Sequence, residues 1–166
     1  MAKFELKGNP FNTVGDLPAV GSSAPDFEMT NTDLSAIKLS GLKGKRVVLN
    51  IFPSLDTDVC AASVRRFNEE AGKLDNTEVV CTSMDLPFAH ARFCVVEGLE
   101  NVVSASDFRT GGFGKAYGAR IVDGPLAGLL ARSVVILDAD GKVIYTELVP
   151  ETTQEPNYEA ALKALG

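Results

Sequence analysis

The sequence of 166 residues has no tryptophan, one histidine and three cysteines. A single histidine offers little material for a histidine-rich metal site or for a hydrolase that needs a histidine base. The cysteines, Cys60, Cys81 and Cys94, form no C-x-x-C pair, and their odd number argues against a framework of structural disulfides. We therefore expect three thiols at rest and no pair of adjacent redox cysteines.

Basic charge and long apolar runs are also scarce. The formal net charge is −6, opposite in sign to the basic surface that a phosphate backbone requires. The N-terminal segment 1–11 lacks the apolar stretch of a secretion signal, and no later run approaches the roughly 18 residues of a membrane span. We therefore expect a cytoplasmic protein that has neither nucleic acid nor a membrane as its partner.

Strand and helix patterns alternate along the chain. Residues 45–53, "KRVVLNIFP", are typical of a strand buried on both faces, and from Asp58 apolar residues recur at helical steps. Further strands are expected at 77–84 and 101–106, hairpins at 3–14 and 132–148, a short helix within 107–119, and helices at 86–98 and 157–165. The length and the 45% hydrophobic content fit one α/β domain spanning residues 1–166.

Cys60 lies where the helix after the first buried strand begins. Unpaired backbone N–H groups and the helix dipole favour a thiolate at such a position. A helix end contributes around 0.3–1 kcal/mol, whereas making a cysteine mostly ionised at neutral pH requires roughly 3.4 kcal/mol, so a cationic side chain is also needed. The alternative for Cys60 is a small buried apolar residue on a core helix, which is the commoner role of a free cysteine.

The neighbours of Cys60 form the pattern P-x-x-x-T-x-x-C, with Pro53 and Thr57 at its other fixed positions. One helical turn brings Thr57 onto the face of Cys60. This pattern resembles the active-site motif of the peroxiredoxins. The resemblance covers nearly the whole chain and is to the thiol peroxidase branch, through "GNP", "VLNIFPSLDTDVCAASVRRFN", "DLPFAHARFC", "AYG", "DGPLAGLLARSVVILD" and "NYEAAL". It implies a thioredoxin-like α/β fold with a central mixed sheet flanked by helices and an N-terminal β-hairpin.

The resemblance also implies roles for individual residues. Cys60 matches the peroxidatic cysteine, Thr57 its hydroxyl partner, Pro53 the residue that shields the pocket, and Arg132 the family's arginine, which would supply the missing cation. Cys94 matches the resolving cysteine, although its neighbours are equally those of a core position. Cys81 lies in an alternating apolar run, and we expect it to be a buried, inert thiol.

The implied activity is that of an atypical two-cysteine peroxidase. It reduces hydrogen peroxide and alkyl hydroperoxides to water and alcohols through a Cys60 sulfenic acid and an intramolecular Cys60–Cys94 disulfide, which thioredoxin recycles. The resemblance implies a homodimer without metal, haem or flavin. Apolar residues beside the motifs could line a pocket for an alkyl tail or fill the core; these residues are Phe52, Leu55, Pro87 and Phe93.

Other interpretations of the same residues are weaker. His90 and Cys94 lie four residues apart, but zinc normally takes two close ligand pairs, so we expect His90 on the helix surface. The segment 111–115, "GGFGK", lacks the flanking residues of a phosphate-binding loop. Two alternatives remain: a disulfide exchanger that uses Cys60 alone, and a redox sensor whose Cys60 oxidises without turnover.

Overall fold

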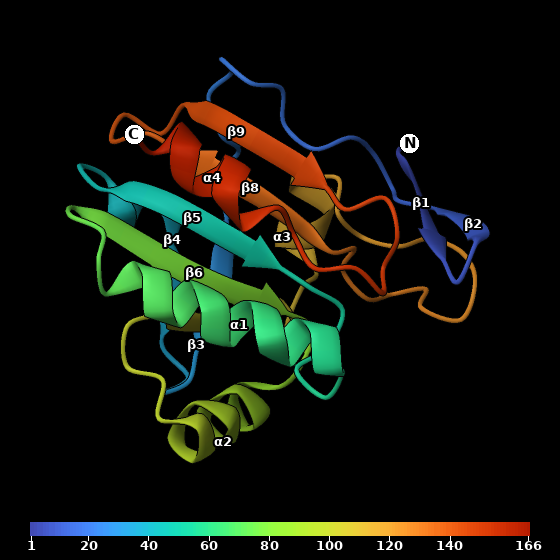
Figure 1. Cartoon of the computed structure of the whole chain (residues 1–166), viewed down its shortest axis with the longest axis horizontal. Helices are drawn as coiled ribbons and strands as arrows, with labels where there is room; N and C mark the ends of the chain where they lie inside the picture. Colours follow the sequence, from blue (N-terminus) through green and yellow to red (C-terminus); the bar gives the residue numbers. More distant parts are fainter.

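A seven-stranded mixed sheet forms the centre of the computed structural model, which describes residues 1–166 (Figure 1). Its strands lie in the order β4-β3-β7-β6-β5-β8-β9. They are β3 (Glu28–Asn31), β4 (Ala36–Lys38), β5 (Arg46–Ile51), β6 (Thr77–Ser83), β7 (Val103–Ser106), β8 (Ser133–Leu137) and β9 (Val143–Leu148). The pairs β5/β6 and β6/β7 are parallel and the other pairs are antiparallel. This confirms the predicted central mixed sheet.

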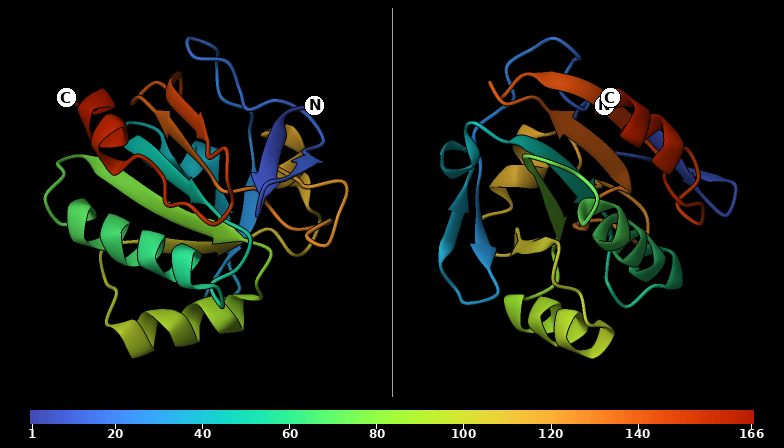
Figure 2. Two further views of the ribbon diagram at one scale, coloured as in Figure 1. Left: turned by 45° about the vertical axis from the view of Figure 1, so that its right-hand side comes forward. Right: turned by 60° about the vertical axis from the view of Figure 1, so that its left-hand side comes forward.

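The alternating side chains of β5 fill a core on each face of the sheet. Val48 packs with residues of α1 (Asp58–Ala71) and α4 (Tyr158–Ala164), whereas Leu49 and Ile51 pack on the opposite face with Phe113 of α3 (Gly112–Ala116). The helix α2 (Pro87–Glu97) packs along β7, beside α1 (Figure 2). Helices therefore flank the sheet on both faces, as the sequence predicts.

Local sequence signals explain where the helices begin and end. Pro87 is the first residue of α2, where its missing N–H costs no helical hydrogen bond. Gly98 ends α2 in the left-handed conformation, with φ 66°, which glycine adopts without steric cost. Asn157 precedes α4 and its side chain accepts a hydrogen bond from the backbone N–H of Ala160.

The predicted N-terminal hairpin is present as β1 (Lys3–Leu6) and β2 (Asn9–Asn12). Its two-residue turn is Lys7-Gly8, with φ 51° and 80°, and Pro10 is the second residue of β2. The hairpin is fastened to the end of the chain: Glu5 N–H donates to Pro150 O (2.7 Å) and Thr152 N–H donates to Glu5 O (2.8 Å). Figure 1 shows the hairpin at the carboxyl end of β9.

Some elements were not predicted from the sequence. These are the strands β3 and β4, which extend the sheet beyond β7, and the 3₁₀ turn η1 (Leu39–Leu42) that follows β4. Separately, none of the helices combines the length and the apolar character that crossing a membrane requires.

Candidate active site

The connection between β5 and α1 places Cys60 at the start of a helix. Phe52 N–H donates to Thr82 O (3.1 Å), and the next residue, Pro53, has no N–H with which to extend the sheet. Thr57 is the N-cap of α1, with the extended dihedral angles φ −112° and ψ 145°. Cys60 is then the third helical residue, inside the first turn where backbone N–H groups lack helical acceptors.

The side chain of Cys60 is 0% exposed and belongs to the core between the sheet and α1. Its cluster includes Phe52, Leu55 and Val64. Burial alone is what a core cysteine would also show, so the neighbours of Cys60 must distinguish a reactive thiol from a structural one.

A cavity of about 210 Å³ opens beside the start of α1. Three of the predicted site residues, Pro53, Thr57 and Arg132, line it together, although they come from two distant segments. Its other lining residues are Leu6, Ser54, Asp58, Val59, Leu126, Leu129, Thr152 and Thr153. Cys60 is not a lining residue, but it directly follows Val59 and lies three residues beyond Thr57.

Arg132 is a buried cation, with 3% of the residue exposed. Its Nε donates a hydrogen bond to the carbonyl oxygen of Thr152 (3.0 Å), whereas Nη1 is buried without a partner. Arg132 lines the cavity, and a guanidinium group whose N–H groups are not all used in hydrogen bonds is well suited to a polar ligand there.

The Thr57 hydroxyl donates to the carbonyl oxygen of Ser54 (3.0 Å). Its one proton is therefore in use, and its oxygen keeps lone pairs that can accept a hydrogen bond. Neither Thr57 nor Arg132 has a hydrogen bond to the sulfur of Cys60 in this structure. The structure thus brings these residues to one cavity without bonding them to the thiol.

Cys94 lies apart from this cavity. It is half-buried on α2, and its sulfur is 3.2 Å from the hydroxyl oxygen of Ser104 on β7. It lines a separate, open hollow together with Leu99 and Val102. Cys60, Cys81 and Cys94 are all free thiols, so this arrangement contains no disulfide.

Cys81 is fully buried on β6, as predicted. Burial raises the pKa of its thiol to about 12, and the side-chain amide of Asn50, 3.6 Å from the sulfur, opposes part of this shift. A thiol with such a pKa holds little thiolate at neutral pH, which fits the inert role expected for Cys81.

The expected surface position of His90 is wrong, because only 1% of this residue is exposed. Its Nε2 lies 3.0 Å from the hydroxyl of Ser83, and its ring packs near Phe52 with a centroid separation of 6.3 Å. Burial lowers the pKa of His90 from 6.5 to about 4, although the charge of Asp85 acts in the opposite direction. His90 is therefore neutral at pH 7, with Nδ1 buried and unpartnered.

The apolar residues expected beside the motifs fill other positions. None of Phe52, Leu55, Pro87 and Phe93 lines the cavity, and the first two belong to the buried core. The apolar wall comes instead from Val59, which directly precedes Cys60, and from three residues remote in sequence, Leu6, Leu126 and Leu129. Two other hollows, of about 230 and 290 Å³ around Lys43 and Arg109, contain none of the predicted site residues.

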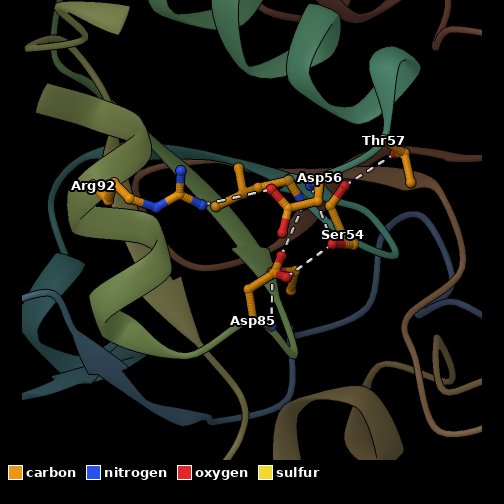
Figure 3. Close-up of polar contacts among 7 residues, drawn as sticks. Ser54, Asp56, Thr57, Asp85 and Arg92 are labelled. Carbon is orange, nitrogen blue, oxygen red and sulfur yellow. Dashed lines mark hydrogen bonds and ion pairs between the residues drawn. The ribbon is translucent and has the colours of Figure 1, made fainter. Parts of the chain in front are cut away.

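Sequence reasoning also missed Asp85, which binds the connection before α1. Its carboxylate accepts hydrogen bonds from Ser54 Oγ (2.9 Å) and Leu55 N–H (2.8 Å) (Figure 3). One signal was available: β5 and β6 are both expected strands, and residues that follow neighbouring parallel strands meet at the same edge of a sheet.

Known proteins are similar to this chain over nearly its whole length. The family model described as Redoxin matches residues 19–162. The chain is 61% identical over 166 residues to a thiol peroxidase of Mycobacterium tuberculosis, covering 100% of this chain and 99% of that protein. It is 52% identical over 165 residues to a thiol peroxidase of Corynebacterium glutamicum, covering 99% of each. The crystal structure of a peroxiredoxin-like protein from Aquifex aeolicus superimposes with a TM-score of 0.94 and 42% identity, covering 99% of this chain and 96% of that one.

Proposed function

The chain belongs to the Redoxin family and is a thiol peroxidase with a thioredoxin-like fold, and we propose that Cys60 is the thiol that attacks its peroxide substrate. One observation carries this assignment: Pro53, Thr57 and Arg132 converge on a cavity at the start of the helix that bears Cys60. Neither Cys81 nor Cys94 has such surroundings, since Cys81 is fully buried on β6 and Cys94 lines a different hollow.

The first step transfers one oxygen atom to sulfur. The Cys60 thiolate attacks the terminal oxygen of R–O–O–H, the S–O bond forms as the O–O bond breaks, and the departing alkoxide takes up a proton to become the alcohol. Negative charge moves from sulfur to the leaving oxygen, so the transition state requires hydrogen-bond donors near that oxygen. Cys60 is left as a sulfenic acid.

The residues of the cavity can meet this requirement. The guanidinium group of Arg132, a residue that lines the cavity, is a charged donor for the leaving oxygen, and it is held in place through the bond of Nε to Thr152. We assign the Thr57 oxygen to accept the hydrogen of the peroxide, because its own proton is donated to Ser54. Buried Pro53 shields this side of the cavity from water.

The lining of the cavity supports alkyl hydroperoxides as well as hydrogen peroxide as substrates. Leu126 and Leu129 form an apolar wall on the same cavity as Arg132. A hydrocarbon group next to the peroxide oxygens would bury apolar surface there, which favours binding by about 0.8 kcal/mol per buried CH₂ group.

Cys94 is proposed to resolve the sulfenic acid. Its thiol attacks the Cys60 sulfur, an S–S bond replaces the S–O bond, and water leaves. The half-exposed position of Cys94 favours this role over the fully buried Cys81. Thioredoxin then returns both cysteines to thiols and becomes oxidised itself, a cycle that suits the reducing cytoplasm.

We further propose that the whole chain, residues 1–166, acts as one catalytic domain and assembles as a homodimer. Support for an interface comes from exposed apolar side chains around α2, namely Leu86, Phe88, Val95 and Val96. Sedimentation of the reduced protein at micromolar concentration tests this, and a purely monomeric profile would contradict it.

The activity is tested by NADPH consumption through thioredoxin reductase and thioredoxin with an alkyl hydroperoxide. Cys60→Ser is expected to abolish turnover and Cys94→Ser to abolish recycling, whereas Cys81→Ala, the matched control, keeps turnover. Reaction with glutathione mixed disulfides but not with peroxide would favour a disulfide exchanger. Oxidation of Cys60 without NADPH consumption would favour a redox sensor.

A further inference from the structure

The carboxylate of Asp85 connects the two segments that carry the reactive cysteines. It accepts hydrogen bonds from Ser54 Oγ (2.9 Å), Leu55 N–H (2.8 Å) and Ser83 Oγ (2.6 Å) (Figure 3). Ser54 and Leu55 belong to the connection that leads into the Cys60 helix. Asp85 itself lies between β6 and α2, two residues before the helix that bears Cys94.

The network continues from Asp85 into α2. The single hydroxyl proton of Ser83 is donated to Asp85, so the contact of Ser83 with His90 (3.0 Å) requires that His90 Nε2 is the donor. The backbone N–H of Asp85 also donates to Ser83 Oγ (3.1 Å). Since His90 is buried and lies one turn before Cys94, these bonds hold the first turn of α2 against the end of β6.

A second connection between the same segments lies on the surface. Arg92 of α2 and Asp56 of the connection form an ion pair with a separation of 3.6 Å (Figure 3). Their side chains are 66% and 74% exposed, and exposed pairs of this kind contribute little to stability. This pair therefore serves as a natural comparison for the shielded bonds of Asp85.

Formation of the Cys60–Cys94 disulfide requires at least one of the two segments to move. A disulfide needs Cα atoms within about 7 Å and the correct direction of both Cβ atoms. Here Cys60 of α1 is buried between its helix and the sheet, whereas Cys94 contacts Ser104 on β7 and lines a different hollow from the peroxide cavity. The bonds of Asp85 to Ser54 and Leu55 join the connection before α1 to the segment before α2, so a movement that separates these two segments breaks them.

We propose that Asp85 is a positioning residue that holds the Cys60 connection and the Cys94 helix closed, and so sets the partition of the Cys60 sulfenic acid between resolution and over-oxidation. In resolution, the Cys94 thiol displaces water from the sulfenic acid and forms the disulfide. In over-oxidation, a second R–O–O–H transfers one oxygen to the sulfenic acid, which gives the sulfinic acid and R–O–H. Closure keeps the cavity assembled for peroxide and keeps Cys94 away. This inference rests on the proposed roles of Cys60 and Cys94.

The test compares Asp85→Ala with the wild-type protein and with Asp56→Ala, which removes a carboxylate from the exposed pair. Reduced protein is mixed with cumene hydroperoxide, quenched with a thiol-blocking reagent at set times, and analysed by mass spectrometry for the thiol, disulfide and sulfinic forms. Asp85→Ala is expected to slow the first oxidation, to speed disulfide formation by about tenfold or more, and to lower the sulfinic yield. Asp56→Ala should change each rate by less than about twofold.

The opposite directions of the two rates separate positioning from general damage. A misfolded protein would be slower in both the first oxidation and disulfide formation. If a folded Asp85→Ala protein were also slower in both steps, the inference would be overturned. An unchanged ratio of disulfide to sulfinic acid would also overturn the inference. If Asp85→Ala does not fold, Ser54→Ala replaces it, because this variant removes the hydrogen bond that Ser54 Oγ donates to Asp85. Both rates are expected to shift in the same directions as for Asp85→Ala, by a smaller factor. Unchanged rates in Ser54→Ala would overturn the inference. Absence of a Cys60–Cys94 disulfide in the wild-type protein would instead contradict the proposed function.

Discussion

The Nε atom of Arg132 donates a 3.0 Å hydrogen bond to the carbonyl oxygen of Thr152, and Thr152 is held in turn by the N-terminal hairpin. The Thr152 N–H and hydroxyl both donate to the carbonyl oxygen of Glu5, at 2.8 and 3.0 Å. The first and last segments of the chain thus orient a guanidinium group that lines the cavity.

Replacing Thr152 with valine is expected to reduce peroxide reduction several-fold while the protein stays folded. The substitution removes the hydroxyl bond to Glu5 and keeps both backbone bonds, at a cost of about 1 kcal/mol in the free energy of unfolding. Stopped-flow peroxide kinetics and urea unfolding measure the two effects. Thr32→Val, an exposed threonine outside the cavity, is the control. Equal peroxide kinetics in both variants would contradict a role for Thr152 in orienting Arg132.

Replacing Arg132 with methionine is expected to lower kcat/KM for peroxide at least about 100-fold, because loss of one donor to a developing oxyanion typically costs this much. Methionine keeps an unbranched side chain of similar length in the buried site. The matched control is Arg109→Met, since Arg109 is exposed and does not line this cavity. A decrease of less than tenfold in a folded Arg132→Met protein would remove Arg132 from the mechanism.

The apolar wall predicts how the substrates are distinguished. Leu129→Asn keeps nearly the same side-chain shape but makes the wall polar, so kcat/KM for cumene hydroperoxide is expected to fall about tenfold relative to that for hydrogen peroxide. Val20→Asn changes an exposed residue outside the cavity and should leave the ratio unchanged. An unchanged ratio in Leu129→Asn would mean that the alkyl group binds elsewhere.

His90 predicts a dependence of stability on pH. Its pKa is lowered from 6.5 to about 4 by burial, so between these values the unfolded chain binds a proton that the folded chain does not. Above pH 6.5 His90 is neutral in both states and the free energy of unfolding is at its full value. As the pH falls toward 4, protonation of the unfolded chain lowers the free energy of unfolding by about 3 kcal/mol in total. Urea unfolding at pH 7.5, 6 and 5 measures this loss.

The control for this pH effect is His90→Gln, whose side-chain amide can still donate to Ser83 but does not titrate. Its free energy of unfolding should change less than that of the wild-type protein between pH 7.5 and 5. Parallel curves for the two proteins would show that His90 is not the group responsible.

The sequence predicted the parts of the fold whose signals are local. The buried strand before Pro53 and the helix after Thr57 follow from residue type and spacing, and so the helix-start position of Cys60 was predictable. In contrast, β3 and β4 have only four and three residues; β3 pairs with distant β7, and β4 pairs with β3. Short strands with exposed outer residues give little periodic signal.

The site was predicted less completely, because several of its contacts join distant segments. Helical spacing around Cys94 could not reveal that His90 is buried, since this depends on Ser83 and on the ring of Phe52. The wall residues Leu126 and Leu129 reach the cavity through a loop with no helical or strand pattern. Family resemblance supplied Arg132, whereas its connection to Thr152 required the structure.

The central claim is the cycle of Cys60 and Cys94, and peptide mapping after one equivalent of alkyl hydroperoxide tests it most directly. Reduced protein is oxidised, its remaining thiols are blocked, and the linked peptides are identified by mass spectrometry. The account predicts a Cys60–Cys94 disulfide, with Cys81 recovered as a thiol that reacts with the blocking reagent only after unfolding, as its raised pKa and burial require. Unmodified Cys60 would contradict the account, and sulfenic or sulfinic Cys60 beside free Cys94 would reject Cys94 as the resolving residue.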